Sequence, residues 1–387
     1  MRYIFMNKRT PVFKVDMSLT PLRINECVEV YNLEFLPVSV RFNNARGTVN
    51  LADFREWFAH RRQPEFRINL NYLLETLNIN TIEEILLNNY GLSLTDQYWF
   101  KPEDVDLSWD EINYFDNDIS GDLGEVIFGI DDKVENWASA DAVTDGGLQK
   151  TWVKENDNLF LYKYSSPLLF DEIQNEVFAS KLAEIMGFDH VPYVESDFHG
   201  IKVSSCPNMI DANTELISIR DITIHDTEWG LTHSFNRLVK LLEAAGISDA
   251  RESLEDILVL DALVANEDRH MRNFGIIRNV ETLEFVKVAS IYDNGMSMHK
   301  NTETSYIPVH IPRAMPFART HTDQVGMANL RRYDFDKLDN IEEHLYRIYS
   351  TNEGHQEEPE RKEIMAEALK KRIEVVKDIQ LSQPRYY

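Results

Sequence analysis

The chain of 387 residues is poor in cysteine and in positive charge. Its two cysteines, Cys27 and Cys206, lie far apart in the sequence, so they form neither a disulfide framework nor a cysteine-based metal site. Lysine and arginine number 40 against 65 aspartates and glutamates, which gives a formal net charge of −25. A general nucleic-acid binder needs a basic face to neutralise phosphates, so the charge argues against direct binding of nucleic acid.

Long apolar runs are also missing. No stretch approaches the ~18 consecutive apolar residues that cross a membrane, so we expect no membrane partner. The first fifteen residues alternate polar and apolar side chains, as in a hairpin that turns at Asn7 and Lys8, and lack the continuous apolar core of a signal peptide. The eleven histidines form no spacing typical of a metal site. The sequence therefore indicates a cytoplasmic protein, and we expect a bacterial one.

Much of the negative charge is local. Residues 101–145 carry 14 aspartates and glutamates against 2 lysines. An acidic surface of this kind mostly keeps a protein soluble, but it also attracts basic partners. Both interpretations stay open from the sequence.

The most informative segment is NEDRHMRNFG at 266–275. It places an acid, Asp268, five residues before an amide, Asn273. A second acid, Asp293, follows a strand-like run at 283–292. Phosphoryl transfer from ATP needs one carboxylate to position the attacking hydroxyl, and an amide and another carboxylate to hold Mg²⁺. The pattern therefore favours a kinase centre over the plainer alternative, a polar turn that only caps a helix.

A second group of candidates lies upstream. Gly146 and Gly147 form a turn between two strand-like runs, where their backbone N–H groups would approach phosphates closely. Lys163 lies on the second run with strand period, and Glu176 lies on a helix predicted at 171–187. A strand lysine tethered by a helix glutamate, with the lysine on the ATP phosphates, is the arrangement of a kinase N-lobe.

These residues resemble the HipA family of bacterial serine/threonine kinases, and most closely the HipA-domain proteins of Gram-positive bacteria. In that family a turn of the form Asp-x-His-x-x-Asn-Phe carries the catalytic Asp and a Mg²⁺-binding Asn, and a Tyr-Asp after the next strand supplies another metal ligand. The resemblance implies that Asp268 is the catalytic base, that Asn273 and Asp293 bind Mg²⁺, and that His270 is a structural member of the catalytic loop. Phosphatidylinositol kinases have a similar Asp-Arg-His turn, so a lipid or small-molecule acceptor stays open.

The upstream order of glycine loop, lysine and helix Asn-Glu also resembles this family, and it implies that Lys163 and Glu176 form the lysine–glutamate pair. The family loop usually reads Gly-Ala-Gln-x-Lys, and its lysine aligns with Lys150. Several members carry an autophosphorylated serine before the loop. Here a valine holds that position, which leaves Thr144 and Thr151 as the candidates for modification.

The sequence predicts an α+β chain with a bilobal protein-kinase-like fold of HipA type. We expect an N-terminal α/β subdomain over 1–135, a kinase N-lobe with a β-sheet over 136–218, and a mainly helical C-lobe over 219–387.

Local patterns predict individual elements within this division. Strands are expected at 190–195 and 200–210, and the backbone from Cys206 to Met209 would meet the adenine of ATP. Helices are expected at 171–187, 234–246, 253–265 and 361–377, with N-caps at Asp171 and Ser253.

The leading hypothesis is an ATP- and Mg²⁺-dependent protein serine/threonine kinase whose protein substrate the sequence does not name. The resemblance adds an expectation that the chain is the toxin of a toxin–antitoxin system with an antitoxin partner, although nothing in the chain itself shows toxicity. Two rivals stay open: a pseudokinase that holds a partner, and a small-molecule or lipid kinase. The joint presence of Lys163, Glu176, Asp268, Asn273 and Asp293 weighs against the pseudokinase, because a module without catalysis has no physical need for the whole set.

Overall fold

The structure is a computed structural model. It describes residues 1–19, 22–61, 75, 86–119, 124, 125, 128, 130, 149–164, 171–227, 234–351 and 360–384. The predicted glycine turn with Gly146 and Gly147, the candidate Thr144 and much of the acidic run 101–145 lie outside the described residues.

The chain forms two compact units. Unit 1 comprises Met1–Tyr164, Ile210–Ile217 and Ile277–Glu284, and unit 2 comprises Ser165–Met209, Ser218–Ile276 and Phe285–Tyr387. Two segments distant in sequence thus return to unit 1. The predicted division at 135 and 218 stays a prediction.

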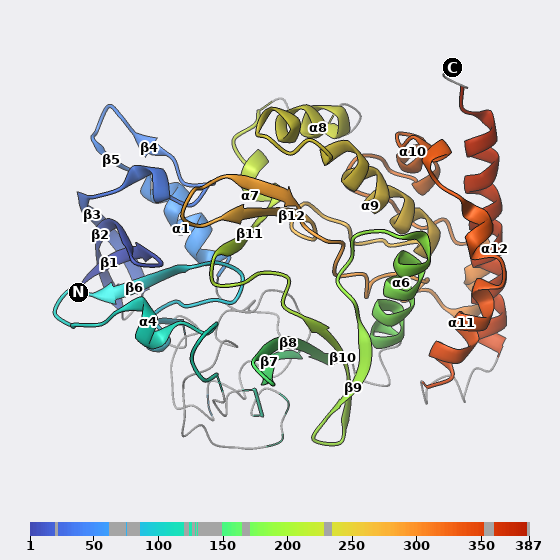
Figure 1. Ribbon diagram of the computed structural model, residues 1–387, viewed down its shortest axis with the longest axis horizontal. Helices are drawn as coiled ribbons and strands as arrows, with labels where there is room; N and C mark the ends of the chain where they lie inside the picture. The colour runs from blue at the N-terminus through green and yellow to red at the C-terminus, as the bar shows by residue number, and fades with distance from the viewer. Residues whose placement is uncertain are drawn as a thin grey trace. The chain divides into compact units, whose positions relative to one another are not determined.

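Unit 1 begins with a four-stranded antiparallel sheet in the order β3-β2-β1-β6 (Figure 1). The predicted N-terminal hairpin is confirmed, because Asn7 pairs with Thr10 and Lys8 adopts a left-handed φ of 50° in the turn. The strands are β1 (Arg2–Asn7), β2 (Thr10–Leu19), β3 (Leu22–Val30) and β6 (Tyr98–Pro102).

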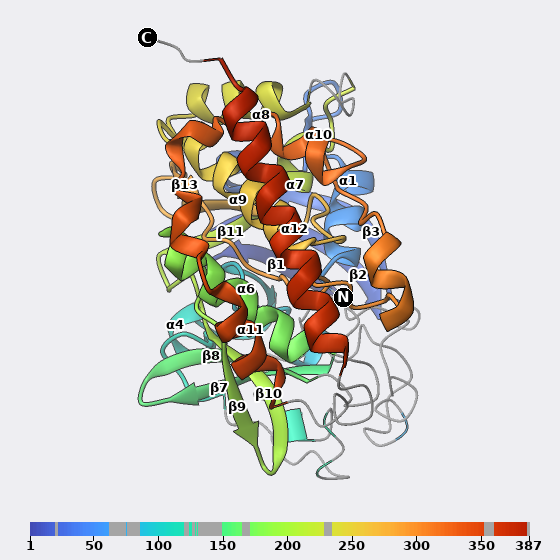
Figure 2. The ribbon, with the colours of Figure 1, turned by 90° about the vertical axis from the view of Figure 1, so that its right-hand side faces the viewer.

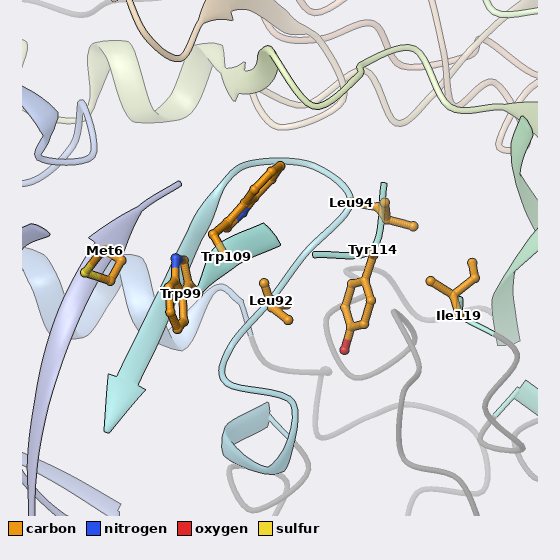
Figure 3. Packing of buried hydrophobic residues seen from close by; sticks show 7 residues of the cluster. All are labelled: Met6, Leu92, Leu94, Trp99, Trp109, Tyr114 and Ile119. Atoms are coloured by element: carbon orange, nitrogen blue, oxygen red, sulfur yellow. The ribbon is translucent and has the colours of Figure 1, made fainter. Parts of the chain in front are cut away.

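Bulky apolar side chains pack beside this sheet. Trp99 and Trp109 are almost fully buried, and the Trp99 indole N–H donates to the carbonyl of Lys8 at 2.7 Å. Aromatic rings bury a large apolar area while their polar atoms still find partners, so they dominate a core of this kind. The cluster in Figure 3 consists of Met6, Leu92, Leu94, Trp99, Trp109, Tyr114 and Ile119.

The rest of unit 1 is built from short elements. A hairpin of β7 (Gln149–Glu155) and β8 (Asn158–Tyr164) turns through Asn156 and Asp157, both with positive φ. The remaining described elements that lie wholly or mostly in this unit are η1 (Leu33–Phe35), β4 (Phe42–Asn43), β5 (Thr48–Val49), α1 (Leu51–Ala59), α4 (Trp109–Ile112), β11 (Thr214–Ser218) and β12 (Gly275–Asn279).

Unit 2 is mainly helical. Figure 2 shows α12 packed against α9 and α11. Its described helices are α6 (Glu172–Met186), α7 (Ile219–Thr223), α8 (Ser234–Ala244), α9 (Ala250–Val264), α10 (His321–Val325), α11 (Ile341–Tyr349) and α12 (Glu360–Ser382). The remaining elements are β9 (Val194–Phe198), β10 (Ile201–Pro207), β13 (Phe285–Val288), η3 (Thr304–Val309), η4 (Leu330–Arg332) and η5 (Phe335–Leu338). No helix in the described ranges is long and apolar enough to cross a membrane.

Several predicted helices are confirmed. α8 buries the expected apolar stripe, and α12 buries Met365, Leu369, Ile373 and Val376 as predicted for the tail. α9 is apolar nearly all round and is correspondingly buried from Leu254 to Val264 except at Asp256.

Two local predictions are wrong, and a third is confirmed in position only. Ser253 does not start α9, because the helix already begins at Ala250. Asp171 is the N-cap residue of α6, as predicted, but its side chain makes no capping bond and instead forms an ion pair with Arg361 at 3.3 Å. The strand expected at 190–195 is β9, which begins only at Val194.

Candidate active site

The polar turn after α9 is held by its own hydrogen bonds. α9 ends at Val264, and the left-handed φ of 53° at its C-cap residue, Ala265, turns the chain. The side-chain oxygen of Asn266 then accepts from the amide of Asp268 at 3.0 Å. The carbonyl of Asp268 accepts from the amide of His270 at 2.7 Å, and the carbonyl of His270 accepts from the amide of Asn273 at 2.8 Å. These bonds fix the backbone at Asp268 and Asn273.

The functional atoms of this turn stay available. The Asn273 side-chain N–H₂ donates to the carbonyl of Asp268 at 2.7 Å, so the amide is oriented with its oxygen away from that contact. Within the described ranges, no donor bonds the Asn273 side-chain oxygen or the Asp268 carboxylate. Both groups therefore keep acceptor oxygens available, and the Asn273 amide is also held in orientation.

Arg269 joins this turn to the turn that carries Asp293. Arg269 is 1 % exposed and pairs with the fully buried Asp261 of α9 at 3.0 Å. The same guanidinium donates to the carbonyl of Asn273 at 2.7 Å and to the carbonyl of Tyr292 at 2.6 Å. It also donates to the side-chain oxygen of Asn294. One buried cation thus fixes the spacing between the two candidate turns.

Sequence reasoning missed Arg269 and Asp261 as parts of the site. The available signal was an acid inside the run ILVLDALV at 257–264, which is otherwise apolar, eight residues before an arginine. A charge at the core side of such a helix requires a partner, because burial of an unpaired charge costs several kcal/mol.

Asp293 sits on a strained turn. Its φ is 58°, a region that residues other than glycine seldom adopt. The strand that precedes it is shorter than the predicted run 283–292, because β13 ends at Val288. The hydroxyl of Tyr292 donates to the carbonyl of Arg272 at 3.0 Å, which is a further link between the two turns.

Helix α6 supports the same turn. The carboxylate of Glu176 accepts from the amide of Asn294 at 2.8 Å, and Glu176 is 2 % exposed. The side-chain N–H₂ of Asn175 donates to the carbonyls of Gly295 and Ser297, each at 2.8 Å. Glu176 therefore anchors the backbone next to Asp293. Its predicted pairing with Lys163 stays a prediction.

The Asp268 carboxyl has a raised pKa. Burial is the main cause, and the negative charge of Asp293 adds to it, while His270 and Arg269 oppose the rise. Two carboxylates thus repel each other at this site. A cation between them would relieve that repulsion.

The oxygen atoms of Asn273 and Asp293 suit Mg²⁺, which takes only part of its ligands from the protein, better than a metal bound entirely by protein side chains. Among the residues that the structure describes, no group of three His, Cys, Asp or Glu side chains gathers to hold a metal. Mg²⁺ is usually bound by one or two carboxylates together with substrate phosphates and water. Asp293 and the oxygen of Asn273 supply such a partial set.

The other predicted nucleotide contacts have the following positions. Lys150 on β7 and Lys163 on β8 are direct cross-strand partners in unit 1. Thr151 is 2 % exposed, so its hydroxyl is withheld from modification in this conformation. Cys206 is buried at the end of β10, and the chain leaves unit 2 after Met209.

Comparison with known proteins identifies the fold. The sequence matches no family model and no curated protein. A solved structure of HipA from Shewanella oneidensis MR-1, in complex with HipB and operator DNA, superposes on 99 % of this chain and 100 % of its own with a TM-score of 0.57 and 14 % identity. The chain has the fold of HipA. The predicted kinase-like α+β architecture is therefore confirmed. The Helicobacter pylori proinflammatory kinase CtkA matches 60 % of this chain and 95 % of its own, with a TM-score of 0.47 and 17 % identity.

Proposed function

We propose that this protein is an ATP- and Mg²⁺-dependent serine/threonine kinase of HipA type that phosphorylates a protein. The observation that carries the proposal is the double turn held by Arg269, which bonds the carbonyls of Asn273 and Tyr292, while no donor among the described residues bonds the Asp268 carboxylate. A turn that served only to cap α9 would not need a second, strained turn bonded to it.

The residues take these roles in the proposal. Asp268 accepts the hydrogen bond of the acceptor hydroxyl and aligns it, and its raised pKa suits it to receive that proton. Asn273 and Asp293 would hold Mg²⁺, which when bound neutralises charge on the phosphates. His270 supports the loop, since its ring nitrogen accepts from the amide of Arg272 at 3.2 Å.

The nucleotide contacts follow from the resemblance. Lys163 and Lys150 would contact the phosphates, and Glu176 would orient Lys163. The backbone at Gly146 and Gly147 would cradle the phosphates. The segment from Cys206 to Met209 would contact adenine.

A toxin role with an antitoxin partner is the finer part of this proposal. The HipA structure that shares the fold was solved with HipB and operator DNA, which describes that protein. For this chain, the strongly negative formal charge of −25 favours a protein partner over direct contact with nucleic acid.

Phosphoryl transfer can be tested directly with labelled ATP. The protein is incubated with Mg²⁺ and three separate acceptor pools: lysate protein, lipid, and small metabolites. Label in protein that is absent with Asp268→Asn supports the proposal. Label only in lipid or metabolites would assign the third class of kinase, and nucleotide binding without transfer would assign a pseudokinase.

A further inference from the structure

Arg372 of α12 differs from the buried arginines of the described chain, because it lacks an ion pair with a carboxylate. It is partly buried, yet it forms no ion pair with any carboxylate in the described part of the chain. The other buried arginines of the described chain each have an acid: Arg61 with Asp96, Arg269 with Asp261, Arg278 with Glu215, and Arg361 with Asp171. A desolvated cation without a counter-charge is costly, so a missing anion is the simplest physical explanation.

Arg372 lines a cavity. The cavity has a volume of about 370 Å³ and lies between α12 and the segment around η3. This is within the size range of small-molecule sites. Its walls include apolar side chains such as Ile307 and Ile364, and Lys371 adds a second cation. The cavity belongs entirely to unit 2.

The neighbours of Arg372 leave its charge uncompensated. Its Nε donates to the carbonyl of Leu263 at 2.9 Å, and its Nη1 donates to Nε2 of His299 at 2.7 Å. A guanidinium only donates, so the proton of neutral His299 lies on Nδ1 and points to Nδ1 of His310 at 3.0 Å. Nη2 faces the weak acceptor Sδ of Met298 at 3.3 Å. Among the described residues, neutral groups accept three of its five N–H donors, which leaves two for a ligand.

Two acidic residues in the lining narrow the ligand class. Glu363 and Glu367 stand on α12, as Arg372 does, and line the same space. They repel a polyanion such as a nucleoside triphosphate. A ligand with one anionic group and an apolar body fits this mixed lining.

We propose that this cavity binds a small molecule that carries a single carboxylate or phosphate group, with the anionic group on Arg372 and the body against Ile307 and Ile364. The site is independent of the proposed kinase activity, because it uses none of the residues assigned to phosphoryl transfer.

A substitution that introduces a carboxylate next to Arg372 tests the proposal. Ala368 lines the cavity four residues before Arg372 on α12, and a glutamate at that spacing and order pairs well with an arginine. Ala368→Glu should therefore raise Tm in buffer without multivalent anions, whereas the uncharged matched control Ala368→Gln should not.

Inorganic phosphate serves as the probe, titrated at constant ionic strength with sodium chloride. The wild type and Ala368→Gln should show a saturable rise in Tm, and Ala368→Glu should show none. Arg372→Met should also lose the response, while Lys163→Met should retain it because Lys163 belongs to the proposed ATP site. A response that survives in Ala368→Glu, a response lost only in Lys163→Met, or no response in the wild type would each overturn the proposal.

Discussion

Arg269 illustrates how one buried side chain sets the geometry of a site. It bonds the carbonyls of Asn273 and Tyr292 while it pairs with Asp261. Arg269→Met should leave Asp261 buried without a counter-charge and cost about 3–5 kcal/mol of the free energy of unfolding. Urea denaturation measures this loss, with unchanged slope as the sign that the folded state is otherwise intact.

The double variant Asp261→Leu with Arg269→Met separates stability from positioning. Replacement of both charges removes the unpaired acid, so stability should recover in part. The kcat for phosphoryl transfer should stay low, because the guanidinium that bonds the carbonyls of Asn273 and Tyr292 is then absent. Recovery of both stability and kcat would mean that Arg269 has only a structural role.

Asp293→Asn should weaken the binding of Mg-ATP. The change removes one negative charge from a hard-cation site whose affinity depends on oxygen charge. Calorimetric titration with Mg-ATP measures the effect, and ATP without Mg²⁺ is the control. Equal affinity for Mg-ATP in both proteins would remove Asp293 from the metal site.

The site residues that could be predicted were those with local spacing. Asp268, Asn273 and Asp293 stand at recognisable distances in the sequence, and Arg269 bonds the turns that carry them. Their catalytic and metal-binding roles stay predictions. The anchoring of the Asn294 amide by Glu176 could not be predicted, because the two residues are 118 positions apart and no periodicity connects them.

The proposed pairing of Lys163 on β8 with Glu176 on α6 can be tested by substitution. Lys163→Met should lose phosphate alignment and lower turnover, whereas Glu176→Gln should show a milder defect because a neutral amide oxygen still accepts from Asn294, though more weakly. If Lys163 and Glu176 act as one unit, their effects on kcat/KM will be strongly non-additive. Additive effects in a double-mutant cycle would mean that the two side chains work separately.

Among the elements, helices were predicted better than strands. α8 and α12 show a clear apolar stripe, which suffices to locate them. β9 is mostly exposed, so its burial pattern carries little information about where it begins. The start of α9 was misplaced because Ser253 resembles an N-cap, while three earlier residues, from Ala250, already continue the helix.

For the molecule as a whole, the kinase-like fold followed from motif resemblance and not from local pattern. Ile210–Ile217 and Ile277–Glu284 join unit 1 although unit 2 surrounds them in sequence. The return of these segments to unit 1 depends on tertiary contacts, which hydrophobic periodicity does not encode.

If the protein is a toxin, its expression should slow bacterial growth, and Asp268→Ala should relieve the effect. The physical reason is that alanine cannot align the acceptor hydroxyl. Growth curves at matched protein levels measure this outcome. Equal slowing by both proteins would indicate a toxic role without catalysis, and the absence of slowing by the wild type would count against the toxin proposal.

The acid stability of the molecule should depend on His299. Burial, with the positive charge of Arg372 and the neighbouring His310, Arg361 and His321, lowers the pKa of His299 to about 3. In the unfolded chain a histidine binds its proton near pH ~6.5, so the unfolded state alone gains a proton as the pH falls from there toward 3. Stability should therefore decline across this window, by up to ~1.4 kcal/mol per pH unit for one such group.

The net charge of −25 does not reverse this decline in the upper part of the window. Self-repulsion is relieved only when carboxylates take up protons, which ordinarily happens near pH ~4. Between pH 6.5 and 5 the histidine effect should dominate, so His299→Asn should flatten the dependence of unfolding free energy on pH, even if it lowers stability at pH 7. His199→Asn is the matched control, because His199 is exposed and also has a positive φ, of 53° against 60° at His299. Urea denaturation at several pH values gives the slopes, and an unchanged slope in His299→Asn would show that other groups control acid stability.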